Sequence, residues 1–208
     1  MSKRCPLTRI VLASASPRRL ELLRSLGLQV EVVPSGYHEP SSPGLTPAEL
    51  GCLHAREKLA ATIAKLGRPG ADAVVAADTV VDVDGVALGK PVDSPDAVRM
   101  LSLLSGREHV VHTAFALALP GHRQWIEELS STRVRFFALE ADEIAEYVAT
   151  GEPFDKAGGY GIQGRAAALV ETIQGDFYTV MGFALGRFVR SLRRSGFSLP
   201  AAKQTPTA

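Results

Sequence analysis

The segment Ser14–Arg19 has the composition of an anion-binding loop. It reads Ser-Ala-Ser-Pro-Arg-Arg and follows the apolar run Ile10–Ala13. Small residues let backbone N–H groups approach a ligand, and a helix N-terminus carries partial positive charge. Arginine at that end of a helix costs up to about 1 kcal/mol unless an anion compensates. We therefore expect Ser14, Arg18 and Arg19 to hold a phosphate, although a capped surface helix with both arginines in solvent remains the alternative.

A carboxylate and an ammonium group flank a predicted β-hairpin. Asp78 follows the apolar stretch Ala73–Ala77, and the Asp-Gly pair at 84–85 predicts a tight turn. Counting outward from that turn pairs Thr79 with Lys90, which brings Lys90 within one step of Asp78. Such a pair suits the activation of water beside a phosphate. A surface ion pair, contributing about 0 to 1 kcal/mol, is the alternative.

The segment Phe154–Gly164 is rich in glycine and polar groups. Its four glycines allow close approach of the backbone to a ligand. Gln163 can both donate and accept hydrogen bonds, as recognition of a base requires, and we expect Lys156 to contact phosphate. A plain flexible connection is the alternative interpretation.

The composition excludes several classes of protein. With 208 residues, 46% hydrophobic and 22% charged, and a formal net charge of +1, the chain is expected to fold without recruiting nucleic acid or a membrane. Cys5 and Cys52 show no CxxC spacing, which suggests neither a disulfide framework nor a zinc site. The N-terminal apolar run is shorter than the roughly 7 to 15 residues of a signal peptide. We expect a cytoplasmic protein.

The elements that must position these residues alternate between strand and helix. Pro17 and Pro47 each follow a capping residue, Ser16 and Thr46, and so begin helices. Strands are predicted at Ile10–Ala13, Gln29–Val33, Ala73–Ala77, Val80–Leu88 (a hairpin), His109–Leu119, Gln124–Phe137 and Ala166–Ile173. Helices are predicted from Pro17 to a stop at Gly27, from Pro47 to about Leu66, from a cap at Ser94-Pro95 to Leu104, at Ala141–Ala149 and at Val180–Arg194. The pattern predicts a mixed α/β fold in one domain, residues 1–197, with a disordered tail over 198–208.

Four motifs, in order, resemble the Maf family of nucleotide pyrophosphatases: LASASPRRLELL, AADTVV, GKP and DKAGGYGIQG. The similarity runs from about Ile10 to about Leu192. It implies a mixed, elongated sheet flanked by helices, with two lobes and a central cleft, related to the inosine-triphosphate pyrophosphatases. It also implies hydrolysis of a nucleoside triphosphate to the monophosphate and pyrophosphate with a divalent cation, Mg²⁺ or Mn²⁺, and suggests a homodimer.

The resemblance assigns roles that spacing alone does not. Asp78 matches the proton acceptor of the family, which activates water to attack the α-phosphorus. Lys58 and Lys90 match its phosphate-handling lysines. Glu39, with Asp78, matches the acidic residues on the metal side. Nothing in the spacing of Glu39 or Lys58 would otherwise distinguish them from surface residues.

The resemblance also implies a substrate. Arg18, Thr79 and Gln163 match the dTTP/UTP branch of the family, whereas the 7-methyl-GTP branch tends to have Trp, Gln and Glu there. We therefore expect dTTP and UTP, or modified pyrimidine nucleotides, to be hydrolysed in a house-cleaning role. The alternatives are an inosine or xanthosine triphosphate pyrophosphatase, and a nucleotide-binding regulator of cell division or septum formation.

Overall fold

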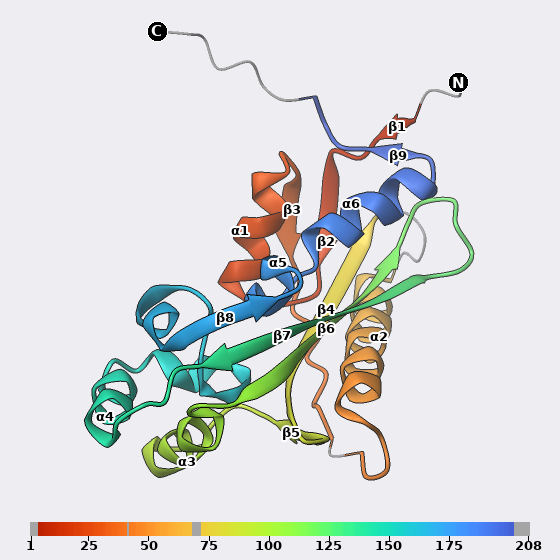
Figure 1. Ribbon diagram of the computed structural model, residues 1–208. Coiled ribbons are helices and arrows are strands. Elements are labelled where there is room, and N and C mark those ends of the chain that lie inside the picture. Colours follow the sequence, from red (N-terminus) through yellow and green to blue (C-terminus); the bar gives the residue numbers. More distant parts are fainter. Residues whose placement is uncertain (1–3, 41, 68–71, 202–208) are drawn as a thin grey trace, which may run out of the picture.

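A mixed seven-stranded sheet runs through the computed structural model of the chain, which describes residues 4–40, 42–67 and 72–201 (Figure 1). Its strands lie in the order β3-β2-β4-β6-β7-β8, and β5 pairs with β4 beside this path. The strands are β1 (Cys5–Pro6), β2 (Arg9–Leu12), β3 (Gln29–Val32), β4 (Val74–Val83), β5 (Val86–Leu88), β6 (Glu108–Ala118), β7 (Ile126–Phe136), β8 (Val170–Gln174) and β9 (Phe197–Ser198). The α-helices are α1 (Pro17–Ser25), α2 (Pro47–Leu66), α3 (Ser94–Leu104), α4 (Ala141–Ala149), α5 (Phe177–Met181) and α6 (Leu185–Arg194). This arrangement confirms the predicted mixed α/β class.

The sheet has a parallel part and an antiparallel part. β2 pairs in parallel with β3 and β4, whereas β4, β6, β7 and β8 pair antiparallel. The first and last strands of the described residues, β1 and β9, form a second, two-stranded parallel sheet. No helix of the described residues is long and apolar enough to span a bilayer.

Local signals in the sequence fix the starts of the helices beside the cavity described below. Ser16 caps α1 by accepting a hydrogen bond from the backbone N–H of Arg19, with proline in the first turn. Thr46 and Glu49 form a capping box at the start of α2, and Gly67 ends that helix in the left-handed conformation. Both helices were predicted with these caps.

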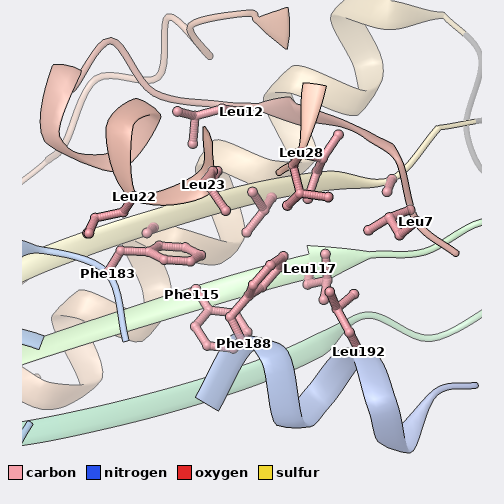
Figure 2. Close-up of a cluster of buried hydrophobic side chains, with 14 of the residues drawn as sticks. Leu7, Leu12, Leu22, Leu23, Leu28, Phe115, Leu117, Phe183, Phe188 and Leu192 are labelled. Carbon is pink, nitrogen blue, oxygen red and sulfur yellow. The ribbon is translucent and has the colours of Figure 1, made fainter. Parts of the chain in front are cut away.

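Near β2, one face of the seven-stranded sheet packs against α1, α5 and α6. Val75 and Ala77 of β4 point to this side, where Phe115 and Leu117 of β6 meet Phe188 of α6. In the view of Figure 2, Leu22 and Leu23 of α1 lie above β6 and Phe188 and Leu192 of α6 lie below it, and all four belong to the cluster on this one face. Side chains of the opposite face, such as Val74 and Ala76, pack against α2 through Ala55 and Leu59.

The face that packs against α1 and α6 carries a second, separate cluster toward the far end of β4. Val81 and Val83, further along β4, pack with residues of α3 and α4, including Leu101 and Ile144. Figure 1 shows α3 and α4 at the opposite end of the long strands from α1 and β3. Thr79 lies between the two clusters along β4, so a polar position separates them.

The structure corrects several predicted boundaries. The apolar strand does not end at Asp78: β4 continues to Val83 because β6 pairs with it from Val74 to Asp82. The final helix is broken at Gly182, whose φ of 102° ends α5 before α6 begins. Residues 164–169 form a 3₁₀ helix, so β8 starts only at Val170, and Asp93 rather than Ser94 caps α3. Ser198, where a disordered tail was expected to start, pairs with β1, and residues 202–208 lie outside the described residues.

Candidate active site

A cavity of about 710 Å³ opens along one edge of β4. On this edge β2 pairs with β4 only at Val74 and Val75, and β5 pairs with it only from Val81 to Val83. Between them, residues 76–80 have no partner strand on this side among the described residues. Asp78 and Thr79 therefore stand at a gap in the sheet where a ligand can reach them.

All ten residues predicted for the site line this cavity. They come from the start of α1, the loop after β3, α2, β4, the segment after β5 and the glycine-rich loop. The residues are Ser14, Arg18, Arg19, Glu39, Lys58, Asp78, Thr79, Lys90, Lys156 and Gln163. Segments far apart in the sequence thus converge on one hollow, although their individual roles stay predictions.

Asp78 is paired with a lysine, but not with the predicted one. The Nζ of Lys58, on α2, lies 2.6 Å from Oδ1 of Asp78 and 2.5 Å from Oε1 of Glu39. Asp78 is only 6% exposed, so it is not the surface residue of the alternative interpretation. Even-numbered residues of β4 face α2, which brings Asp78 to Lys58. The ammonium group bridges two carboxylates that converge on the cavity.

Glu39 is charged in this arrangement. Burial by itself raises the pKa of Glu39. The hydrogen bond from Lys58 and its positive charge lower the pKa, with smaller lowering effects from His54 and Lys90, and together these outweigh the effect of burial. The net result is a pKa below the ordinary value of a glutamate. Glu39 and Lys58 were assigned only by resemblance, and the fold brings them into direct contact.

Lys90 lies on the rim of the cavity. The predicted hairpin register is confirmed, since Val81 pairs with Leu88 and Val83 with Val86, but β5 ends at Leu88. Lys90 follows as an exposed residue, and its positive charge contributes to lowering the pKa of Glu39. The predicted Asp78–Lys90 pair is replaced by the Asp78–Lys58 pair, because α2 covers the side of the sheet toward which Asp78 points.

His54 is a cavity residue that was not predicted. It lies one helical turn before Lys58 on α2 and is buried, with its Nδ1 3.4 Å from the hydroxyl of Tyr37. Both residues line the cavity. The signal was present in the sequence, because a spacing of four residues places His54 on the same helix face as Lys58.

The two arginines of α1 have different partners. Arg18 NH1 lies 3.2 Å from Oδ2 of Asp155, across the cavity on the glycine-rich loop. Arg19 instead bonds within the protein: its Nε donates to the carbonyl of Gly182, and its two terminal nitrogens donate to the hydroxyls of Ser14 and Thr79. Burial lowers the pKa of Arg19, and the charge of Asp78 opposes that shift. Asp155 is thus the anion that compensates Arg18 at the helix N-terminus.

The glycine-rich loop presents Gln163 to the cavity. Gln163 is exposed, and its amide has no hydrogen-bond partner in the ranges that the structure describes. The Nζ of Lys156 lies 2.5 Å from the carbonyl of Glu152 and 2.5 Å from Oδ1 of Asp155. Lys156 therefore holds the loop together at the wall of the cavity, whereas Gln163 is available to a ligand.

The donor set fits a hard divalent cation. No group of three or more His, Cys, Asp or Glu suited to a metal occurs among the described residues. Asp78 and Glu39, however, already share one cationic partner, Lys58, through an oxygen of each carboxylate. Mg²⁺ commonly takes one or two protein carboxylates and completes its shell with water and substrate phosphates. Two convergent carboxylates beside a large cavity are compatible with that mode.

Comparisons with known proteins extend over nearly the whole chain. Residues 9–195 match the family of Maf-like proteins. The chain is 46% identical over 198 residues to a protein of Bordetella parapertussis named dTTP/UTP pyrophosphatase, covering 92% of this chain and 95% of that protein. It is 45% identical over 188 residues to a Thermus thermophilus protein of the same name, covering 90% and 95%. Among solved structures, the Staphylococcus aureus Ham1 protein aligns with a TM-score of 0.46 at 14% identity, over 79% of this chain and 81% of that one.

Proposed function

The chain belongs to the Maf family, and we propose that it hydrolyses dTTP and UTP to the monophosphate and pyrophosphate. The names of its relatives in Bordetella parapertussis and Thermus thermophilus support this substrate choice. The observation that carries the proposal is the buried Asp78 carboxylate, paired with Lys58 and opening into a cavity lined by cationic side chains. A site that only bound nucleotide would not need such a carboxylate.

Asp78 is the general base in the proposed reaction. Oδ1 accepts the hydrogen bond from Lys58, which leaves Oδ2 to take the proton of a water molecule. The oxygen of that water attacks the α-phosphorus, the bond to the bridging oxygen breaks, and pyrophosphate leaves. Lys58, Lys90 and Arg18 face the negative charge that develops on the phosphates.

Asp78 and Glu39 would hold a divalent metal ion, Mg²⁺ or Mn²⁺, through their carboxylates. Such an ion, when bound, neutralises phosphate charge and orients the triphosphate. Lys58 places its positive charge against both carboxylates, and the pKa of Glu39 lies below its ordinary value. Ser14, Arg19 and Lys156 are proposed to complete the wall around the phosphates.

Arg18, Thr79 and Gln163 are proposed to read the base. Gln163 offers both a donor and an acceptor, which matches the edge of a uracil or thymine ring. Its exposure in the cavity and its free amide support this role. Modified pyrimidine nucleotides that keep the same edge would bind in the same way.

Pyrophosphate release across a nucleotide panel tests the function. The panel contains dTTP, UTP, CTP, GTP, 7-methyl-GTP, ITP and XTP, each with Mg²⁺ and with Mn²⁺. We expect the highest kcat/KM for dTTP and UTP. Preference for ITP or XTP would instead indicate a purine-specific enzyme, and tight binding without release of pyrophosphate would indicate a regulator.

The setting of the enzyme is also a proposal. Cys5 and Cys52 are free thiols, which agrees with a reducing compartment such as the cytoplasm. Resemblance to the family alone suggests a homodimer. Measurement of the mass in solution by light scattering distinguishes a dimer from a monomer.

A further inference from the structure

A row of hydroxyl groups crosses the sheet beside the cavity, on the face opposite to Asp78. Thr79 of β4 pairs with Thr113 of β6, which in turn pairs with Ser130 of β7. Thr113 is fully buried, Ser130 is nearly so, and Thr79 opens into the cavity. The row lies between the two hydrophobic clusters of this face. Buried hydroxyls at the junction of two apolar clusters require hydrogen-bond partners.

The groups that bond to Thr79 and Thr113 determine which hydroxyl of this row donates and which accepts. Thr113 Oγ1 lies 2.7 Å from the carbonyl oxygen of Thr179, and a carbonyl can only accept. The single hydroxyl hydrogen of Thr113 is therefore used in that bond. Thr79 Oγ1 lies 2.9 Å from Thr113 Oγ1, so Thr79 must donate its own hydrogen to Thr113.

Arg19, which bonds to Thr79 at the other end of this series of hydrogen bonds, requires the same donor and acceptor roles. Arg19 NH2 lies 3.1 Å from Thr79 Oγ1, and a guanidinium can only donate. Thr79 thus accepts one hydrogen bond from Arg19 and gives its only hydrogen to Thr113. A hydroxyl oxygen has two lone pairs, so one remains to face the cavity. Toward any ligand, Thr79 can act only as an acceptor.

We propose that Thr113 is a positioning residue that holds the hydroxyl of Thr79 as a hydrogen-bond acceptor for an N–H group of the nucleotide base. The proposal rests on the proposed function, because it places the base at Thr79. Thr113 does not line the cavity and acts through Thr79 alone. Without the Thr113 hydroxyl, the hydrogen of Thr79 has no acceptor in the row and can turn toward the ligand, where it opposes an N–H donor.

Calorimetric titration with α,β-methylene-UTP, which resists hydrolysis, in the presence of Mg²⁺ tests this inference. We expect Thr113→Val, which keeps the shape of the side chain, to raise the dissociation constant about threefold to tenfold, the net effect of one hydrogen bond. Thr113→Ser restores the hydroxyl and should restore the wild-type value. Thr79→Val should weaken binding by a similar factor.

A double-mutant cycle separates positioning from a general structural effect. If Thr113 acts through Thr79, the variant with both valines binds no more weakly than Thr79→Val alone. Effects that multiply, a Thr79→Val variant with unchanged affinity, or failure of Thr113→Ser to restore binding would each overturn the proposal. Because binding is measured without turnover, these outcomes are distinct from a failure of the nucleotide panel to release pyrophosphate.

Thr132→Val provides the matched control. Thr132 is also a buried threonine, on β7, and its hydroxyl bonds to the backbone of Asp176 rather than to the Thr79 row. We expect this variant to lower the free energy of unfolding, measured in urea, without changing the dissociation constant. An equal loss of affinity in Thr132→Val and Thr113→Val would show that loss of any buried hydroxyl weakens binding, which overturns the proposal.

Discussion

Asp78 and Thr79 are neighbours in β4, yet their side chains lie in two different environments. Asp78 points toward α2, where the ammonium group of Lys58 lies 2.6 Å from Asp78 and 2.5 Å from Glu39. Thr79 points to the other face, where its hydroxyl joins a neutral chain that ends at the carbonyl of Thr179. A charged group touches this series at each end: Arg19 donates to the Thr79 hydroxyl, and the Asp176 carboxylate accepts from the backbone N–H and the hydroxyl of Thr179.

The difference follows from the alternation of side chains along a strand. On the charged side, ionised groups attract one another at the wall of the cavity, which suits chemistry on a triphosphate. On the neutral side, each hydrogen has one assigned acceptor, which suits the recognition of a fixed pattern of donors and acceptors. One unpaired strand edge thus presents an ionised side chain and a neutral hydroxyl to the same cavity.

The largest expected effect is on the charged side. Asp78→Asn removes the general base but keeps the shape of the side chain, so kcat for dTTP and UTP should fall by roughly 10² to 10⁴. Pyrophosphate release measures this, and circular dichroism checks the fold. Asp82→Asn is the control, since Asp82 lies on the same strand and bonds to Gly85 and His112 outside the cavity. Near-normal turnover in Asp78→Asn would show that Asp78 is not the general base.

The neutral side is expected to respond to acid through His109. Burial among Phe136 and Tyr160 lowers the pKa of His109 to about 4 from an ordinary value of 6.5. Since the folded pKa is the lower one, the resulting stability is present above about pH 6.5 and is lost as pH falls through about 4. The loss should reach roughly 3 kcal/mol well below pH 4.

Urea unfolding between pH 4 and pH 7 measures this effect. His109→Gln cannot gain that proton, and its amide can still accept a hydrogen bond from the Tyr160 hydroxyl, which lies 2.5 Å from the His109 ring. We expect this variant to show a flatter pH dependence than the wild type. His122→Gln, at an exposed position, should leave the dependence unchanged. Equal slopes for wild type and His109→Gln would mean that this side is not kept neutral by burial.

A smaller effect is expected at the base-reading end. Gln163→Glu keeps an acceptor and loses the donor, so kcat/KM for dTTP and UTP should fall about tenfold, as one hydrogen bond in the transition state implies. Because Gln163 is exposed, the free energy of unfolding should change by less than about 0.5 kcal/mol. Unchanged relative rates across the nucleotide panel would contradict base reading by this residue.

The smallest effect concerns the contact across the cavity. Asp155 pairs with Arg18 and with Lys156, so a triphosphate must compete with its carboxylate for both cations. Asp155→Asn weakens this competition, and the KM for UTP should fall by up to about fivefold, the range of a partly exposed ion pair. Steady-state kinetics at low salt measure it, and an increase in KM would show that Asp155 instead holds Arg18 in its binding position.

Much of the fold was predictable because its signals are local. The caps of α1 and α2 depend on residues within one turn, and the hairpin register follows from the turn at Asp84-Gly85. Errors occurred where distant pairing overrode local composition. β4 runs through Asp78 because β6 lies alongside it, and Gly182 breaks a helical pattern where its carbonyl accepts a hydrogen bond from Arg19.

The sequence, together with its resemblance to the family, predicted ten residues that line the cavity and the elements that carry most of them, but it missed others such as His54 and Tyr37. It could not decide which of two lysines meets Asp78, or which way the hydroxyl of Thr79 is turned. Those contacts join residues 20, 34 and 66 positions apart: Lys58 with Asp78, Thr79 with Thr113, and Thr113 with Thr179. Caps and turns act over a few residues, whereas such contacts depend on how α2, β6 and α5 pack against the sheet, which only the tertiary structure decides.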